Sequence, residues 1–368
     1  MRLKKRAPDF LIFLTTILLL ALGVVMVFSA SAVTAEQKFG DAFYFLKNQL
    51  TWAVIGIVAM VVAMSVDYYR IKKLAWPALI IGVLCLIAVL APGIGKEVKG
   101  AQRWIGIGSA SFAPSEMIKL CLIFFMAFSL SEYGDKIKDL IKGLGPHLGI
   151  LGLVVVLIML QPDLGTTVAV AGTVYFMLLA AGARWGHLIG LAVIGVAGVL
   201  VLIITEEYRW QRFTAFLNPW KDPLDTGFQT IQSLYALGSG GLFGVGLGRS
   251  HQKMFYLPEQ HSDFIFSILG EELGYLGVLV VIGLLFLFIW RGLRTAITCP
   301  DAFGSLLAVG ITCWIGLQAI INIGVASGSL PVTGITFPLL SYGGSSLLFT
   351  LTGIGMLLNI SKFSTQGR

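Results

Sequence analysis

An acidic cluster precedes a long apolar stretch in the C-terminal third of the chain. The segment PEQHSDFIFSILGEELG, residues 258–274, places Asp263 at the start of the stretch and Glu271 and Glu272 inside it. Ionised carboxylates in hydrocarbon are costly, so membrane segments usually exclude them. Asp263 can cap a helix that begins there. Alternatively, a partly desolvated carboxylate is a stronger base and can remove a proton from a lipid-bound substrate. We interpret Glu271 and Glu272 as packing or ion-pair groups.

A second pair of charges lies in PSEMIK, residues 114–119. Ser115 is predicted to cap a helix. Glu116 and Lys119 are three residues apart, so they share one helix face and can pair with each other. A local ion pair near the membrane surface is one interpretation. The other is that Lys119 faces Asp263 and tunes its charge, because ionisable groups inside membranes are commonly functional.

Two short motifs have a structural and a functional interpretation each. In GAQRW, residues 100–104, Arg103 and Trp104 can anchor the chain at the membrane interface. They can equally hold a phosphate and stack on a sugar, because Arg suits bidentate phosphate contacts. In QPDLGT, residues 161–166, Asp163 is expected mainly to cap a helix after a turn.

The longest segment without membrane character, residues 206–263, is rich in glycine, aromatic residues and positive charge. GFQTIQSLYALGSGGLFGVGLG predicts an interfacial amphipathic helix followed by a glycine-rich loop. No strand–turn–helix unit surrounds these glycines, so a nucleotide-binding loop is disfavoured. In segment 206–263, Arg209, Arg212, Arg249 and Lys253 supply positive charge that an anionic ligand could use. Residues 331–346 then interrupt the last apolar region, and broken backbone at membrane depth must line a cavity or pack against protein.

Composition indicates which elements position these residues. The chain of 368 residues is 57% hydrophobic and 12% charged, against about 25% charged in soluble domains. We therefore predict an all-α integral membrane protein, a single polytopic domain over residues 1–368. The ten expected spans are 9–31, 48–66, 75–91, 115–131, 148–161, 164–182, 186–205, 264–290, 303–327 and 338–360. The loop 206–263 then lies outside the cytoplasm, between the seventh and eighth spans.

The distribution of charge gives an orientation and excludes other classes. Lys and Arg are concentrated in short loops on one side, which places both termini in the cytoplasm. The first apolar run could be a signal peptide, but its length favours a retained span. The net charge is +7, but the sequence contains no basic helix with interleaved aromatic residues. Nucleic-acid binding is therefore excluded. The four cysteines suggest neither disulfides nor zinc, and His251 and His261 form no metal cluster.

Taken together, these motifs and their order resemble the SEDS family (shape, elongation, division and sporulation), almost from end to end. The most specific matches are YLPEQHSDFIFSILGEELG and NIGVASGSLPVTGITFPLLSYGGSS. FLNPWKDP and FQTIQSLYALGSGGLFGVGLG are more similar to the FtsW/SpoVE branch of the family than to RodA.

The resemblance implies an enzyme, a peptidoglycan glycosyltransferase that polymerises lipid II and releases undecaprenyl pyrophosphate at the outer face of the bacterial cytoplasmic membrane. It implies a class B penicillin-binding protein as partner. Asp263 would be the catalytic base, with Lys119 and Glu116 in support. A divalent cation, Mg²⁺ or Mn²⁺, would help to neutralise the pyrophosphate, with no dedicated metal ligands predicted. The expected substrate-binding residues are Arg103, Trp104, Asp163, Arg209, Arg212, Arg249, Lys253, Gln229 and Ser341.

Two other functions remain open from the sequence. A lipid II flippase also needs many spans, but its charged site should lie near the membrane midplane, whereas these charges gather at one interface. A scaffold that only recruits the penicillin-binding protein would need Asp263 for folding alone. The process served, whether elongation, division or sporulation, is not specified by these residues.

Overall fold

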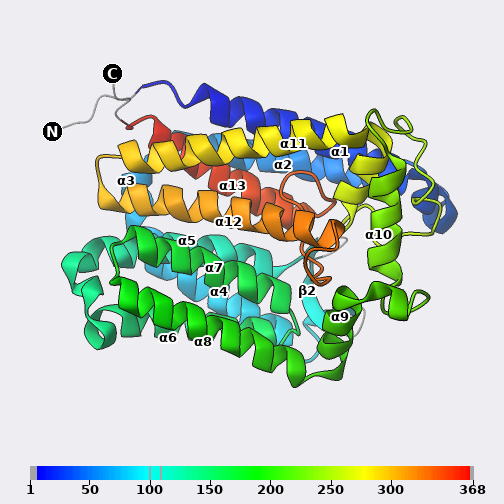
Figure 1. The fold of residues 1–368 in the computed structure, drawn as a ribbon. Helices are drawn as coiled ribbons and strands as arrows, with labels where there is room; N and C mark the ends of the chain where they lie inside the picture. Colours follow the sequence, from blue (N-terminus) through cyan, green and yellow to red (C-terminus); the bar gives the residue numbers. More distant parts are fainter. Residues whose placement is uncertain (1–5, 99–100, 108–109, 365–368) are drawn as a thin grey trace.

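The computed structural model describes residues 6–98, 101–107 and 110–364, and its helices form an elongated bundle (Figure 1). The first half contains α1 (Phe10–Phe39), α2 (Tyr44–Ser65), α3 (Tyr68–Ile71), α4 (Ala75–Leu90), α5 (Pro114–Tyr133), α6 (Gly145–Met159), α7 (Leu164–Ala180) and α8 (Trp185–Ile204). The second half contains α9 (Glu207–Leu217), α10 (Phe228–Ser239), α11 (Ile265–Thr298), α12 (Ala302–Ala326) and α13 (Gly344–Ser361).

The predicted membrane bundle is confirmed. In the described residues, nine helices are long and apolar enough to cross a membrane, and α7 is a shorter apolar helix of 17 residues. These ten correspond to the ten expected spans. The centre of the bundle is α12, which packs against α5, α7, α11 and α13, while α8 lies at the periphery with most of its side chains exposed. Exposed apolar side chains on such helices are what a lipid-facing surface requires.

Helix ends follow local sequence signals. Asp9 caps α1 by accepting hydrogen bonds from the amides of Leu11 and Ile12, and Gly40 ends the same helix with a positive φ of 67°. The helix α5 begins at Pro114, with Ala113 as N-cap, so the prediction that Ser115 caps it is wrong. Pro is favoured at the first helical position because its missing amide hydrogen has no intrahelical partner there.

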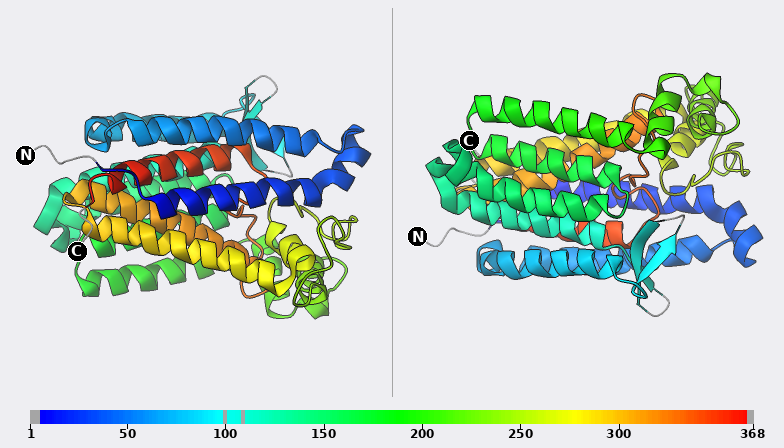
Figure 2. Two further views of the ribbon diagram at one scale, coloured as in Figure 1. Left: turned by 90° about the horizontal axis from the view of Figure 1, so that it is seen from above. Right: turned by 90° about the horizontal axis from the view of Figure 1, so that it is seen from below.

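The two ends of the bundle differ in character (Figures 1 and 2). The start of α1 and the end of α13 lie at one end. The other end carries α9, α10 and a small antiparallel sheet of β1 (Gly95–Val98), β2 (Ala101–Ile107) and β3 (Ala110–Phe112). In its register, Lys96 pairs with Trp104 and Ile105 pairs with Phe112. The sequence interpretation did not include this sheet.

The helix α11 is broken at Gly274, where φ is 67° and ψ is −168°. The glycine-rich loop after α10 satisfies the backbone around the break. The amides of Val245 and Gly246 donate to the carbonyls of Glu271 and Glu272 over 3.0 and 3.1 Å. In return, the amide of Tyr275 donates to Gly241 over 2.9 Å. The loop was predicted to follow an amphipathic helix, and its packing on α11 explains its glycines.

Replacing Gly274 by Ala should destabilise the protein by at least about 2 kcal/mol. Its backbone conformation is accessible essentially only to glycine. A Cβ atom there would also lie 2.2 Å from the backbone nitrogen of Gly244. Thermal unfolding of the purified variant in detergent measures the loss. Gly195→Ala in α8 is the control, since its Cβ would meet nothing within 4 Å. Equal melting temperatures for both variants would contradict this account of the break.

Candidate functional site

Asp263 lies in a turn immediately before α11, at the end of the bundle that carries the sheet. The N-cap of α11 is Phe264, and no side chain caps that helix. Asp263 is half-buried, and its amide donates to the carbonyl of Glu259 over 3.1 Å. The interpretation of Asp263 as a helix cap is therefore wrong.

The backbone around Asp263 is held by the irregular segment 331–343. The hydroxyl of Ser341 donates to the carbonyl of Ser262 and accepts from the amide of Phe337. The amide of Tyr342 donates to the carbonyl of His261 over 2.9 Å. This segment was predicted to belong partly to the last span, which instead begins at Gly344. Ser341 was predicted to bind substrate. It is only 5% exposed and its hydroxyl bonds to backbone, so it positions the Asp263 turn instead.

The helix α12 contributes two buried amide side chains to the same region. Asn322 donates to the carbonyl of Asp263 over 2.8 Å and to that of Ile335 over 2.7 Å. Gln318, one turn earlier, donates to the carbonyl of Thr336 over 3.0 Å. Gln318 was missed in the sequence, although its four-residue spacing from Asn322 in an apolar span was the signal that could have found it.

Lys119 connects to this region through Gln318. Its ammonium group lies 2.8 Å from a carboxylate oxygen of Glu116 and 3.4 Å from the side-chain oxygen of Gln318. It also lies 5.5 Å from the ring centroid of Trp314. The predicted local ion pair is present and buried, with Lys119 3% exposed. A direct effect of Lys119 on the charge of Asp263 stays a prediction.

Two arginines bring positive charge to the Asp263 end. Burial lowers the pKa of Arg212. The segment 332–335 lies beside Asp263, because a Cβ atom on Gly334 would lie 3.6 Å from a carboxylate oxygen of Asp263. The same segment packs on the start of α7, where a Cβ atom on Gly165 would lie 2.9 Å from the side chains of Thr333 and Ile335. Arg212 donates to the carbonyl of Val332 over 3.1 Å. Arg103 donates to the carbonyls of Gln161 and Pro162 over 2.8 and 2.6 Å. Asp263, Arg212 and Arg103 thus converge from distant parts of the chain.

The remaining predicted substrate-binding residues are spread over several elements. Trp104 is half-buried beside Arg103 on β2, and Gln229 is half-buried on α10. Asp163 caps α7, accepting from both the amide and the hydroxyl of Thr166, as its turn interpretation expected. Arg209 donates to the carbonyl of Leu202 near the end of α8 over 3.0 Å, and Arg249 is exposed in the glycine-rich loop.

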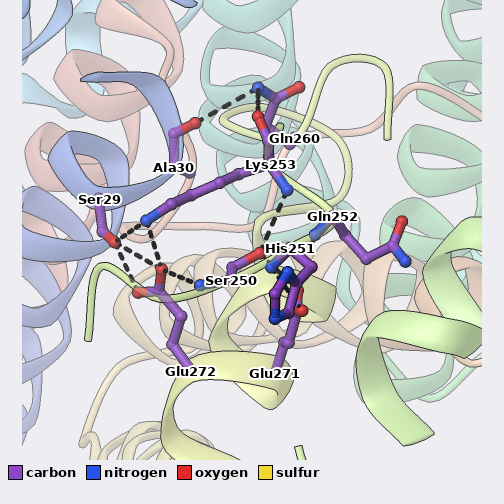
Figure 3. Close-up of polar contacts among 9 residues, drawn as sticks. All are labelled: Ser29, Ala30, Ser250, His251, Gln252, Lys253, Gln260, Glu271 and Glu272. Atoms are coloured by element: carbon purple, nitrogen blue, oxygen red, sulfur yellow. Dashed lines mark hydrogen bonds and ion pairs between the residues drawn. The ribbon is translucent and has the colours of Figure 1, made fainter. Parts of the chain in front are cut away.

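Lys253 is the clearest correction among the predicted substrate contacts (Figure 3). Its ammonium group lies 2.9 Å from a carboxylate oxygen of Glu272, and the two side chains are 4% and 0% exposed. Its charge is neutralised inside the protein by Glu272, so the prediction that Lys253 contacts the pyrophosphate is wrong. The interpretation of Glu272 as an ion-pair group is confirmed.

Further hydrogen bonds around this ion pair hold residues 250–260, the segment that precedes Asp263 (Figure 3). Ser29 of α1 donates to Glu272 over 2.7 Å. Glu271 accepts from the hydroxyl of Ser250 and, over 2.8 Å, from the amide of His251. Gln260 donates to the hydroxyl of Thr34 over 2.9 Å. The segment 250–260 is thereby tied to α1 and α11.

A metal centre at this end of the bundle would be built from His, Cys, Asp or Glu side chains that lie close together. In the described ranges, no three His, Cys, Asp or Glu side chains gather closely enough to hold a metal ion. The ring of His261 instead packs on Phe45 and Tyr342, with centroids 4.6 and 5.6 Å away.

Similar proteins support the resemblance noted in the sequence. A family model described as "Cell cycle protein" and labelled FtsW, RodA and SpoVE matches residues 9–366. The stage V sporulation protein E of Bacillus subtilis (strain 168) is 49% identical, covering 99% of this chain and 100% of that protein. A probable peptidoglycan glycosyltransferase FtsW of Geobacter sp. (strain M18) is 46% identical, covering 96% of each chain.

Solved structures have the same fold. A chain from a peptidoglycan synthase complex, described as showing structural coordination of polymerization and crosslinking, matches with a TM-score of 0.80 and 32% identity, covering 96% of this chain and 98% of the other. The rod shape determining protein RodA of Thermus thermophilus matches with a TM-score of 0.73 and 30% identity, covering 98% and 99%. The chain therefore belongs to the FtsW/RodA/SpoVE family of cell cycle proteins.

Proposed function

We propose that this chain is a peptidoglycan glycosyltransferase that polymerises lipid II at the outer face of the cytoplasmic membrane. The observation that carries the proposal is the convergence of Asp263 with Arg212 and Arg103 at one membrane end of the bundle. A base beside cationic groups suits a reaction that needs a deprotonated hydroxyl and a departing pyrophosphate. Relatives named as probable peptidoglycan glycosyltransferases, at 44–46% identity, support the same reaction.

In the proposed step, the Asp263 carboxylate removes the proton from the 4-hydroxyl of the acceptor sugar. The resulting oxygen nucleophile attacks the anomeric carbon of the donor chain. The bond between that carbon and the pyrophosphate oxygen breaks, and undecaprenyl pyrophosphate leaves with the electron pair. Arg212 and Arg103 stabilise its negative charge. A single displacement inverts the configuration at the anomeric carbon.

The hydrogen bonds to the Asp263 turn have a clear role in this mechanism. Asn322 and Ser341 bind backbone carbonyls of residues 263 and 262, not the carboxylate itself. They fix the position of the base through its backbone, so these two contacts do not occupy the oxygens that act on a substrate. Such preorganisation lowers the barrier because the base needs no reorganisation at the moment of reaction.

The orientation and partner follow from the same proposal. The end that holds the termini is cytoplasmic, since Lys and Arg are concentrated in its short loops. The end with α9, α10 and the sheet then faces outward. The similar chain belongs to a peptidoglycan synthase complex that is described as coordinating polymerization and crosslinking. We therefore propose that a class B penicillin-binding protein accompanies this chain and supplies the transpeptidase activity.

A divalent cation stays a separate proposal. Because the described residues provide no cluster of ligands, Mg²⁺ or Mn²⁺ would have to be held largely by the substrate pyrophosphate. We assign no step of the mechanism to it.

Replacing Arg212 by Gln should lower kcat/KM for lipid II polymerisation on the order of 100-fold, because one cationic group at the leaving pyrophosphate is lost. The bond to Val332 is also lost, which costs only about 1 kcal/mol of stability. Initial rates with fluorescent lipid II measure the effect. Arg70→Gln, an exposed arginine at the opposite end, should leave the rate unchanged. Equal losses in both variants would argue against a local role for Arg212.

The function itself is tested with purified protein and its partner in proteoliposomes that contain labelled lipid II. Glycan polymer with inverted linkages supports the proposal. Movement of lipid II across the bilayer without polymer would identify a transporter instead. A third result would identify this chain as a scaffold. The partner would co-purify with it but would polymerise lipid II equally well without it.

A further inference from the structure

A cationic cavity of about 340 Å³ lies at the end of the bundle opposite Asp263. It is lined by residues before and within the first turn of α1, by the last two turns of α11 and by the end of α13. Its charged residues are Arg6, Asp9, Arg291 and Arg294. The volume is many times the ~30 Å³ that one water molecule occupies, so the cavity can admit a polar group of several atoms.

The charges in this cavity do not balance. Arg291 donates to a carboxylate oxygen of Asp9 over 3.0 Å, and these side chains are only 12% and 9% exposed. The other oxygen of Asp9 accepts from the amides of Leu11 and Ile12. Asp9 and Arg291 therefore satisfy each other and the start of α1. Neither Arg6 nor Arg294 forms an ion pair with any side chain in the described ranges, which leaves an excess of two positive charges.

The surroundings indicate what carries the opposite charge. Arg291 and Arg294 lie 5.8 and 5.9 Å from the ring centroid of Trp290, which is 48% exposed. Exposed tryptophan is typical of the level where lipid headgroups meet the hydrocarbon. Phe10, which lines the cavity, is 68% exposed, and Ile297, one helical turn after the lining residue Arg294 on α11, is 83% exposed. The surface that adjoins the cavity is therefore apolar. A ligand with an anionic head and an apolar tail matches both surfaces.

We infer that this cavity binds the phosphate of an anionic phospholipid headgroup from the membrane leaflet at the termini end. Arg6 and Arg294 neutralise the phosphate, while Arg291 is kept in place by Asp9. The acyl chains lie along Phe10, Trp290 and Ile297. Basic pockets between membrane helices on the cytoplasmic side bind anionic headgroups by this chemistry. The inference is independent of the proposed glycosyltransferase activity.

The test compares lipid retention by native mass spectrometry of the full-length protein. Protein in detergent is mixed with equal amounts of phosphatidylglycerol and phosphatidylcholine. We expect the wild type to retain phosphatidylglycerol preferentially. The variant Arg6→Gln/Arg294→Gln should lose on the order of tenfold in apparent affinity, because two charges near the surface are removed. Asp9 and Arg291 are unchanged in this variant, which preserves the ion pair between α1 and α11.

A matched control removes the same charge from the same membrane end. Arg70 and Arg184 are exposed and lie outside the cavity, so Arg70→Gln/Arg184→Gln should retain phosphatidylglycerol as the wild type does. Equal retention by all three proteins, or equal loss in both variants, would overturn the inference. Displacement of the lipid by millimolar inorganic phosphate would keep the phosphate site but assign it to a soluble anion rather than a headgroup.

Discussion

Asp263→Asn should reduce lipid II polymerisation by about 10²–10⁴-fold, the usual contribution of a general base. Asn has nearly the shape of Asp but cannot accept the proton of the attacking hydroxyl. Its fold should be intact, because Asn322 and Ser341 bind the backbone of residues 262–263 and need no carboxylate. Rates with labelled lipid II, melting temperature and co-purification of the partner measure the three properties separately.

The acidic residue Asp225 provides the control for this variant. It lies exposed in the same long connection between α8 and α11, and Asp225→Asn removes the same charge without touching the Asp263 turn. We expect wild-type rates from it. Undiminished polymer from Asp263→Asn would remove Asp263 from the mechanism. Loss of polymer together with a lower melting temperature or loss of the partner would indicate that Asp263 has a structural role only.

Lys253→Met should destabilise the protein by about 3–5 kcal/mol, because it leaves the carboxylate of Glu272 buried without its partner. This is a large part of the ~5–15 kcal/mol that typically separates folded from unfolded protein. The double variant Lys253→Met/Glu272→Met should recover most of the loss, since apolar replacement of a buried ion pair is often neutral. Thermal and denaturant unfolding in detergent distinguish the two variants.

An exposed ion pair shows what a loss of charge alone costs. Lys138 and Asp135 are 51% and 92% exposed, so Lys138→Met should change stability by less than about 1 kcal/mol. Two results would contradict this account of the buried Glu272 charge. One is a loss of stability in Lys253→Met as small as that in Lys138→Met. The other is a double variant that is no more stable than Lys253→Met.

The sequence predicted the bundle well because hydrocarbon imposes a single pattern on every span. It predicted neither the break at Gly274 nor the sheet near Trp104, since both depend on contacts between distant segments. The assignment of residues 338–343 to a span failed for the same reason. Hydropathy favours a helix there, whereas Ser341 and Tyr342 instead bind the turn before Asp263.

The site was predictable in its residue types and less so in its geometry. Asp263, Glu116 and Lys119 stand out because charges are rare in apolar segments. The pairing of Lys253 with Glu272 links residues 19 positions apart through a folded loop, and no local spacing reveals it. A positive residue in a loop is equally consistent with binding a ligand and with neutralising a buried acid.

The short helix α7 has a consequence for the membrane itself. Its 17 residues rise about 26 Å at 1.5 Å per residue, whereas the hydrocarbon layer is about 30 Å thick. Arg103 binds the backbone carbonyls of the turn at the start of α7, so that end of the short helix lies at the Asp263 end of the bundle. Local thinning of the bilayer is one way in which a short helix is accommodated. Thinning here would bring the headgroups of neighbouring lipids toward the bundle's interior. If the bilayer thins in this way, a thicker membrane would resist the deformation and slow the approach of a lipid-linked sugar.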